Sequence, residues 1–203
     1  MQRLYAKGLT TTSGGNVSCR LDGGLMAISA SKFDKGNLRA DQVCIIAANG
    51  RYMTPHLAAS IETELHLAIY AVRPDVNAIV HAHPVTASAF CATQTPIDTH
   101  LTAEAYAILG DPAWIPYALM GTPQLAKRVA DGMAEAVCAL MENHGVITVG
   151  KTLLEAFDRL ELLEVAAKHT LLVRQIGTPS PLTPERLDEL DVFVGRKKEN
   201  ANG

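Results

Sequence analysis

Two histidines in one short segment could bind a divalent metal together. His81 and His83 are two residues apart in the segment 77–83, which is rich in β-branched residues and predicts a strand. Side chains alternate between the two faces of a strand, so both imidazoles point the same way and could reach one ion at roughly 2.0–2.1 Å. The spacing alone is weak evidence, because this pair of residues also occurs by chance.

A third histidine, His144, adds weight to this interpretation. It lies in the turn 142–145 (ENHG), where Gly145 lets the backbone bend sharply. A lone histidine in a loop is often only a surface residue. Three nitrogen ligands with an open fourth position would be typical of a catalytic site rather than a structural one. Zinc is the ion we expect, although manganese or cobalt also suits three imidazoles.

One carboxylate could supply a base for chemistry at such a site. Glu62 and His66 are four residues apart in the predicted helix 60–73, so they lie on one helix face. Taken alone, Glu62 would be a solvated helix carboxylate. A displaceable carboxylate close to a metal could instead act as the base in carbonyl chemistry.

The elements that must position these residues form a mixed pattern of strands and helices. Strands are predicted at 17–21, 25–29, 43–47, 77–83, 138–142 and 146–149, with Asp22-Gly23 turning the first hairpin. Helices are predicted at 60–73, 85–92, 122–136 and 153–176, the third one capped by Thr122. This order predicts an α/β fold with three α/β/α layers, whose central sheet is mixed, mostly antiparallel and flanked by helices. Residues 1–195 are expected to form a single domain, followed by a polar tail at 196–203.

Composition narrows the class of protein. A chain of 203 residues suits one domain with its own core, and its net charge of −3 gives no support for a nucleic-acid or membrane-surface partner. No apolar run is long enough to span a bilayer, and residues 1–5 show no apolar core of a signal peptide, so we expect a cytoplasmic protein. The four cysteines are far apart in sequence and are expected to be reduced structural thiols.

Several motifs occur in the order seen in one known family. They are GGNVS at 14–18, SASK at 29–32, SIE at 60–62, RPDVNAIVHAH at 73–83, PY at 116–117 followed by GT at 121–122, and ENHG at 142–145. With them, residues 3 to 175 resemble the class II sugar-phosphate aldolases, whose family also includes ribulose-phosphate 4-epimerases and adducin head domains. The segment 73–83 is the most specific match.

The resemblance implies roles for individual residues. His81, His83 and His144 match the zinc ligands of the family, and Glu62 matches an acid that ligates zinc in the resting site and then serves as base. The positions that hold the substrate phosphate correspond to Gly15, Asn16, Ser29, Ser31 and Ser60. Family members are usually tetramers with the active site at a subunit interface, so a homotetramer that acts on a small phosphorylated sugar is expected. The bland interpretation of the glycines and serines is ordinary turn chemistry.

The sequence also departs from the family pattern. Lys32 stands where many members have glycine; it could bind a substrate phosphate or carboxylate, or simply be solvated. Thr102 and Phe193 occupy positions at which the fuculose-phosphate aldolases carry tyrosines, and the tyrosine closest to the first is Tyr106. Ile61 replaces a serine. Glu104 lies where epimerases carry an acid, although a surface carboxylate is the simpler interpretation.

These features favour a metal-dependent lyase that cleaves a ketose 1-phosphate to dihydroxyacetone phosphate and a short aldehyde. The alternatives on the same metal site are a ribulose-phosphate 4-epimerase and a ketose-phosphate dehydratase. A different alternative is a non-catalytic scaffold similar to the adducin head. A scaffold would have no reason to keep three histidines and Glu62 together.

Overall fold

A seven-stranded sheet forms the middle layer of residues 1–197, which the computed structural model of the chain describes. The strands are β1 (Asn16–Leu21), β2 (Leu25–Ser29), β3 (Val43–Ala47), β4 (Ala78–Ala82), β5 (Ala113–Ile115), β6 (Cys138–Met141) and β7 (Gly145–Gly150). Their order across the sheet is β3-β2-β1-β4-β7-β6-β5. Within the described chain β5 and β6 are parallel, and every other neighbouring pair of strands is antiparallel. The prediction of a mixed, mostly antiparallel sheet is confirmed.

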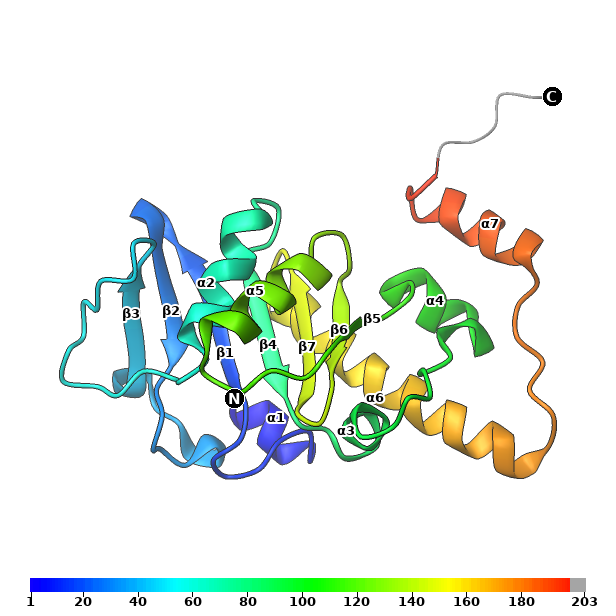
Figure 1. Cartoon of the computed structure of the whole chain (residues 1–203), viewed down its shortest axis with the longest axis horizontal. Coiled ribbons are helices and arrows are strands. Elements are labelled where there is room, and N and C mark those ends of the chain that lie inside the picture. Colours follow the sequence, from blue (N-terminus) through cyan, green and yellow to red (C-terminus); the bar gives the residue numbers. More distant parts are fainter. Residues whose placement is uncertain (198–203) are drawn as a thin grey trace.

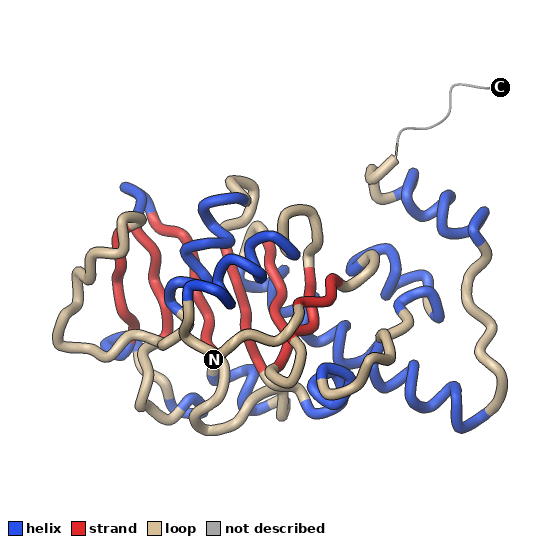
Figure 2. The backbone as a smooth tube through the Cα atoms, viewed as in Figure 1, coloured by secondary structure: helices blue, strands red, loops and turns tan. Residues whose placement is uncertain are grey.

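Helices cover both faces of this sheet, as Figure 1 shows. The helices are α1 (Gln2–Ala6), α2 (Thr63–Val72), α3 (Val85–Cys91), α4 (Ala103–Leu109), α5 (Pro123–Gly132), α6 (Leu153–Ile176) and α7 (Pro184–Phe193). The pair α2 and α5 packs on one face, and α3 and α6 pack on the other. The predicted three-layer architecture is therefore confirmed. Figure 2 shows α4 and α7 beyond the β5 edge of the sheet, away from β1 and β4.

Two hydrophobic cores separate the layers, and β4 contributes to both. Val80 and Ala82 belong to the core under α3 and α6, whereas Ile79 belongs to the core under α2 and α5. All residues of β4 and of its neighbour β7 are buried. Since alternate residues share a face, His81 projects with Ile79 toward the α2 side of the sheet. The central strand thus carries a histidine into the interior, where its polar atoms need partners.

Helix α2 begins later than the sequence predicts, and this changes the setting of Glu62. The predicted helix started at residue 60 with Ser60 as its N-cap, but α2 begins at Thr63 with Glu62 at the N-cap position. The hydroxyl of Ser60 accepts a hydrogen bond from the Glu62 backbone N–H at 3.3 Å, and the Ser60 carbonyl accepts one from the Thr63 hydroxyl at 2.7 Å. These bonds hold residues 60–62 in a tight non-helical turn. Glu62 is therefore a fixed residue at a helix entrance instead of a solvated helix side chain.

Short elements near the C-terminal half were not predicted. Helix α4 and the three-residue strand β5 are short, and the longer helix α7 buries only Asp191, so none of them shows a clear hydrophobic period. Arg196, in the predicted polar tail, donates to the Asp191 carboxylate at 2.7 Å and to the Tyr106 carbonyl at 2.5 Å. The rest of that tail, 198–203, lies outside the described residues. The four cysteines are free thiols, as predicted, and no described helix is long and apolar enough to cross a membrane.

Candidate metal centre

A backbone carbonyl of the neighbouring strand β7 orients the His81 ring. Its Nδ1 donates to the carbonyl of Val146 in β7 at 2.9 Å, and the side chain is wholly buried. Because Nδ1 carries the hydrogen, Nε2 presents its lone pair to the α2 side of the sheet. A backbone carbonyl that fixes the tautomer and ring orientation is the usual outer support of a histidine metal ligand.

His83 and His144 complete a three-nitrogen cluster with His81. The Nε2 atoms of His81 and His83 lie 3.1 Å apart. Donor atoms of all three histidines lie within 4.8 Å of one another. Two nitrogens bound to one tetrahedral ion with bonds of about 2.05 Å would be separated by about 3.3 Å. The cluster can therefore take a metal with small adjustments of the rings, and the convergence predicted for the three histidines is present.

A turn residue and a glycine bring His144 to the cluster. Asn143 has a positive φ of 53°, so it makes the sharp bend that the sequence assigned to Gly145. Gly145 is needed for a different reason. A Cβ at this position would overlap the His83 ring and would lie 2.8 Å from the Ala82 carbonyl oxygen. The motif after β6 thus has one residue that turns the chain and another that leaves space for the opposing ligand.

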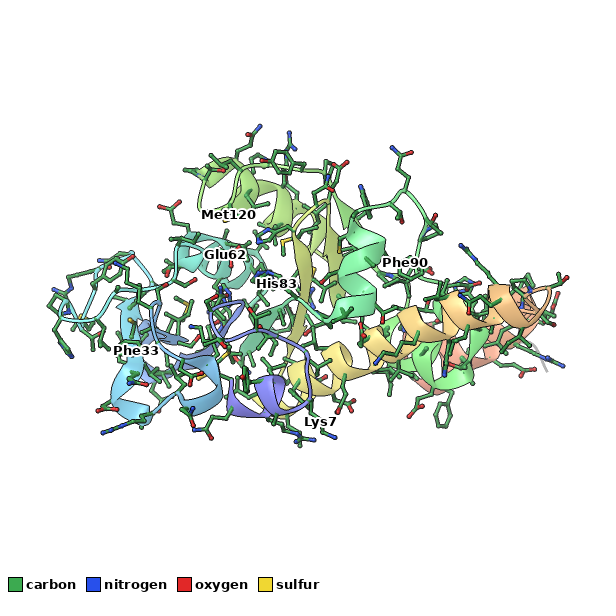
Figure 3. The ribbon with its side chains drawn as sticks, turned by 90° about the horizontal axis from the view of Figure 1, so that it is seen from below. Lys7, Phe33, Glu62, His83, Phe90 and Met120 are labelled. Atoms are coloured by element: carbon green, nitrogen blue, oxygen red, sulfur yellow. The ribbon has the colours of Figure 1, made fainter. Side chains whose placement is uncertain are left out.

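Glu62 faces two of the histidines. Its Oε2 lies 3.2 Å from Nε2 of His81, and its Oε1 lies 2.9 Å from Nε2 of His144. Oε1 is buried and accepts no directed hydrogen bond from any described residue, despite this short distance. A buried carboxylate oxygen without a donor, beside three imidazoles, is what a bound cation would satisfy. The residues present therefore fit a divalent ion with three nitrogen ligands and one oxygen ligand. Figure 3 shows two of these residues, Glu62 and His83, near each other.

The electrostatics of the cluster also suit a metal. Burial and the neighbouring His81 and His144 lower the pKa of His83 to about 4, and burial lowers the pKa of His81. Both rings are neutral at neutral pH, and a neutral imidazole is the form that binds metal. Burial alone would raise the pKa of Glu62, but the two facing histidines and Asn16 outweigh it and hold that pKa well below its usual range. The carboxylate is therefore ionised.

Comparison with known proteins identifies the family. Residues 1–171 match the family described as the Class II Aldolase and Adducin N-terminal domain. The chain belongs to the class II aldolase and adducin family. It is 32% identical over 173 residues to an L-fuculose phosphate aldolase of Methanococcus maripaludis, which covers 85% of this chain and 93% of that protein.

Two further relatives show the range of activities within the family. A solved structure of an L-fuculose 1-phosphate aldolase superposes with a TM-score of 0.87 at 29% identity, over 96% of this chain and 92% of that one. A 3-oxo-tetronate 4-phosphate decarboxylase of Haemophilus influenzae is 29% identical over 170 residues, covering 81% of this chain and 80% of that protein. Family membership therefore establishes the fold and the aldolase relationship without choosing between these two reactions.

In this class II aldolase family member, a cavity of about 370 Å³ opens beside the three-histidine cluster. Its lining includes most of the residues predicted to bind substrate or metal: Gly15, Asn16, Ser31, Lys32, Ser60, Glu62, His83 and His144. Two predicted site residues are not among them. His81 is wholly buried in β4, and Ser29 is buried within β2, where its hydroxyl accepts the backbone N–H of Val17 at 3.1 Å. A larger cavity of about 780 Å³ lies between α4, α6 and α7, but none of the three histidines lines it.

Thr102 and Phe193, at which the family resemblance implies tyrosines, do not reach the 370 Å³ cavity beside the histidines within one chain. Thr102 caps α4 by accepting the Ala105 backbone N–H, and the Tyr106 hydroxyl donates to Asp191 at 3.2 Å. Phe193, on α7, is 84% exposed. Glu104 lies in the first turn of α4 and is exposed. None of these side chains lines the 370 Å³ cavity beside the histidines.

Sequence reasoning assigned Asn16 to the substrate phosphate and placed His66 on the helix face of Glu62, but it missed the contacts that connect these residues to Glu62. Asn16 donates to Oε2 of Glu62 at 2.7 Å, and the carbonyl oxygen of its side chain contacts Nε2 of His66 at 2.5 Å. The nitrogen Nδ1 of His66 lies 2.6 Å from the hydroxyl of Ser18. The spacing of Asn16 and Ser18, two apart on β1, shows that they share a strand face, but it does not show which helix residues they meet.

Proposed function

We propose that the protein is a metal-dependent aldolase that cleaves a ketose 1-phosphate to dihydroxyacetone phosphate and a short aldehyde, and that also runs the reverse condensation. The observation that carries this proposal is the convergence of His81, His83 and His144 on Glu62 beside a cavity with small polar side chains. Zinc is the proposed ion, because three histidine ligands are typical of catalytic zinc, and Glu62 would occupy the fourth position only until substrate binds.

Each group has a defined task in this reaction. When bound, the divalent ion supplies Lewis-acid polarisation of the substrate carbonyl and stabilises the negative charge that develops on its oxygens. In the condensation direction Glu62 removes a proton from the carbon beside the carbonyl of dihydroxyacetone phosphate. In the cleavage direction the hydroxyl beside the breaking bond loses its proton as the aldehyde forms, and this proton has to reach Glu62. Glu62 then gives it to the same carbon of dihydroxyacetone phosphate and is left as a carboxylate.

The phosphate of the substrate would lie against the part of the cavity wall that Gly15, Asn16 and Ser60 form. Ser60 Oγ accepts hydrogen bonds from Asn16 and from the Glu62 backbone, so its own hydrogen remains available to an anion. Gly15 has a φ of 68°, and a Cβ there would lie 2.5 Å from the His81 carbonyl oxygen. The loop therefore needs glycine, whose bare backbone lets an anion approach closely.

A panel of substrates tests the proposal. Protein reconstituted with zinc is incubated with several ketose 1-phosphates, and dihydroxyacetone phosphate is measured by a coupled enzyme assay. The proposal predicts release of dihydroxyacetone phosphate from at least one sugar and loss of release after chelation. If no ketose 1-phosphate is cleaved while an inverted pentulose phosphate or a dehydrated product forms, the alternative of an epimerase or dehydratase replaces it.

Decarboxylation of a 3-oxo acid phosphate is the second candidate, and Lys32 favours it. This residue lines the cavity with a φ of 64°, a conformation uncommon for a residue with a side chain. A cation at this wall could hold a substrate carboxylate. The electron pair of the broken bond would pass to the carbonyl oxygen as in aldol cleavage, and carbon dioxide would leave instead of an aldehyde. Release of carbon dioxide from 3-oxo-tetronate 4-phosphate, without aldol cleavage of any sugar, would establish this reaction.

A non-catalytic scaffold similar to the adducin head is the remaining alternative. It predicts protein that contains less than about a tenth of an equivalent of metal when purified without a metal-affinity tag. The cluster of three histidines around an orphaned carboxylate oxygen argues against it. Emission spectroscopy on such protein separates the two classes.

We also propose that the active form is a homotetramer with its sites at subunit interfaces, as the family resemblance implies. Two apolar side chains at the cavity, Ile61 and Met120, are 61% and 54% exposed in the single chain, and a second copy would cover them. A partner could also supply the group that carries the hydroxyl proton of the leaving aldehyde. Light scattering on the eluted protein measures the subunit number. A cytoplasmic location stays a prediction.

A further inference from the structure

Six polar side chains form a ladder between strand β1 and helix α2. Asn16, Ser18 and Arg20 are spaced by two on β1, and Glu62, His66 and Tyr70 are spaced by four along α2, starting at its N-cap. Two residues of a strand advance about 6.7 Å and four residues of a helix advance about 6.0 Å. The two spacings therefore stay in register, and each strand side chain meets the helix side chains next to it.

Hydrogen bonds connect the ladder from one end to the other. Asn16 lies between Glu62 and His66, with contacts of 2.7 and 2.5 Å. Ser18 lies between His66 and Tyr70, with contacts of 2.6 and 2.9 Å. Arg20 donates to the Tyr70 carbonyl at 2.5 Å, and its guanidinium lies over the Tyr70 ring at 4.6 Å. His66 is wholly buried in the middle of this series.

The ionised carboxylate of Glu62, at one end of the ladder, fixes which group donates in each hydrogen bond. Glu62 is a carboxylate and can only accept, so Asn16 must present its NH₂ group to Glu62 and its carbonyl oxygen to His66. His66 then needs its hydrogen on Nε2, which leaves Nδ1 as an acceptor for the Ser18 hydroxyl. Ser18 in turn accepts from the Tyr70 hydroxyl. Burial and the nearby His81 lower the pKa of His66 to about 3, which agrees with a neutral ring.

We propose that His66 is a positioning residue for the reaction, which locks the Asn16 amide in one orientation and thereby holds the Glu62 carboxylate at the three histidines. The proposal deepens the function proposed above and rests on it for its catalytic part. An Asn16 amide rotated by 180° would place its oxygen against Oε2 of Glu62, where two acceptors repel each other. Without the N–H of His66, nothing on the His66 side opposes that rotation.

The same arrangement gives Asn16 a second use during turnover. Its two amide hydrogens go to Ser60 at 3.0 Å and to Glu62 at 2.7 Å. When Glu62 turns to meet the substrate carbon, the second hydrogen becomes free, and Asn16 lies in the cavity wall where the substrate anion is proposed to bind. His66 keeps the amide pointing to that place, so base movement and anion binding are coupled through one side chain.

The protonation state of His66 tests the proposal without any assay of activity. Protein labelled with ¹⁵N on its histidines and stripped of metal is studied by long-range ¹H–¹⁵N correlation, with His66→Gln used to assign the signal. The proposal predicts a protonated Nε2 and an unprotonated Nδ1 on His66. An Nδ1–H tautomer or a doubly protonated ring would overturn it, whether or not the protein proves to be an aldolase.

A matched set of variants tests the effect on Glu62. His66→Leu removes the N–H, and His66→Gln offers an amide N–H in its place. The buried neighbour Ile69→Val, on the same helix, controls for loss of packing. Visible absorption of the cobalt-loaded proteins reports ligation by Glu62, and Glu62→Gln gives the spectrum without the carboxylate. We expect His66→Leu to move toward the Glu62→Gln spectrum and to lose about a hundredfold in kcat. We expect His66→Gln to recover most of both.

Two results would contradict the positioning role. One is a cobalt spectrum of His66→Leu that equals that of the wild type. The other is a change of the same size in Ile69→Val, which would mean that packing rather than the N–H controls the site. If the spectra follow the expectation but no aldol cleavage is found, the ladder stands and the proposed reaction fails. The two claims are therefore separable.

Discussion

The Nε2 atoms of His81 and His83 lie 3.1 Å apart, and each ring is placed there by a different device. His81 is held by the Val146 carbonyl from inside the sheet, whereas His83, just beyond the end of β4, fits only because residue 145 is glycine. In the absence of an ion, one ring donates an N–H to the other across this distance, and the lone pair of His81 Nε2 suits it as the acceptor. A bound cation would replace that shared hydrogen and take a lone pair from each ring.

Removal of one ligand should lower metal affinity without unfolding the protein. We expect His83→Ala and His144→Ala to bind zinc at least about tenfold more weakly than the wild type, because the effect of a ligand should exceed that of its outer support. Titration with a competing chelator measures the affinity. His56→Ala, which removes an exposed histidine, is the control and should bind zinc normally. Equal affinity in all three variants would mean that the cluster is not the metal site.

Glu62→Gln should retain metal and lose turnover. Three imidazoles remain to hold the ion, but an amide cannot accept the substrate proton, so kcat should fall by about 10²–10⁴-fold. Cleavage rates and metal content are measured on the same preparation. Glu64→Gln, two residues further on, changes an exposed carboxylate and should leave both values unaltered. A fully active Glu62→Gln would remove this residue from the mechanism.

Gly145→Ala should weaken zinc binding and lower the free energy of unfolding, although it changes no metal ligand. The added methyl would meet the His83 ring and the Ala82 carbonyl, and such overpacking costs about 1–3 kcal/mol of unfolding free energy. We expect weaker zinc binding together with this loss, measured by chelator titration and by urea unfolding. Gly177→Ala is the control, since no atom lies within 4 Å of a Cβ built there. A Gly145→Ala protein with normal zinc affinity would show that His83 can move without cost.

Lys32 should show a conflict between stability and binding. Its φ of 64° costs about 1 kcal/mol or more for a residue with a side chain, so Lys32→Gly should be more stable than Lys32→Ala. If the amino group binds a substrate anion, both variants should raise KM by a similar factor. Thermal unfolding and steady-state kinetics provide the two readouts. An unchanged KM in both variants would leave Lys32 as a solvated surface residue.

The longer elements of the fold could be predicted from the sequence because their patterns are strong. The strands around residues 17–21, 25–29 and 77–83 and the helix 153–176 are confirmed with little change in their bounds. Helix α4 and strand β5 are short and gain their order from tertiary contacts, which a local pattern does not show. Helix α7 buries only Asp191, so its sequence carries no apolar stripe. The start of α2 was misplaced because Ser60 is a good cap residue by type, yet its hydroxyl and carbonyl bond to the turn that precedes the helix.

The sequence predicts the candidate site where the spacing of residues fixes the direction of their side chains. It does not predict the site where a hydrogen-bond partner from another element fixes the position of a side chain. The alternation of strand side chains was enough to bring His81 and His83 together. Ser29 was expected at the substrate and is instead buried in β2, because the hydrogen bond to Val17 is a cross-strand contact. The link from Glu62 through Asn16 to His66 depends on the registry of β1 against α2, which the sequence does not show.

Anomalous diffraction at the zinc edge, from crystals of protein prepared without a metal-affinity tag and supplied with zinc, tests the central claim most directly. The account predicts one strong peak per chain, within about 2.0–2.1 Å of nitrogens from His81, His83 and His144. A peak elsewhere, or no peak among these three rings, would contradict it.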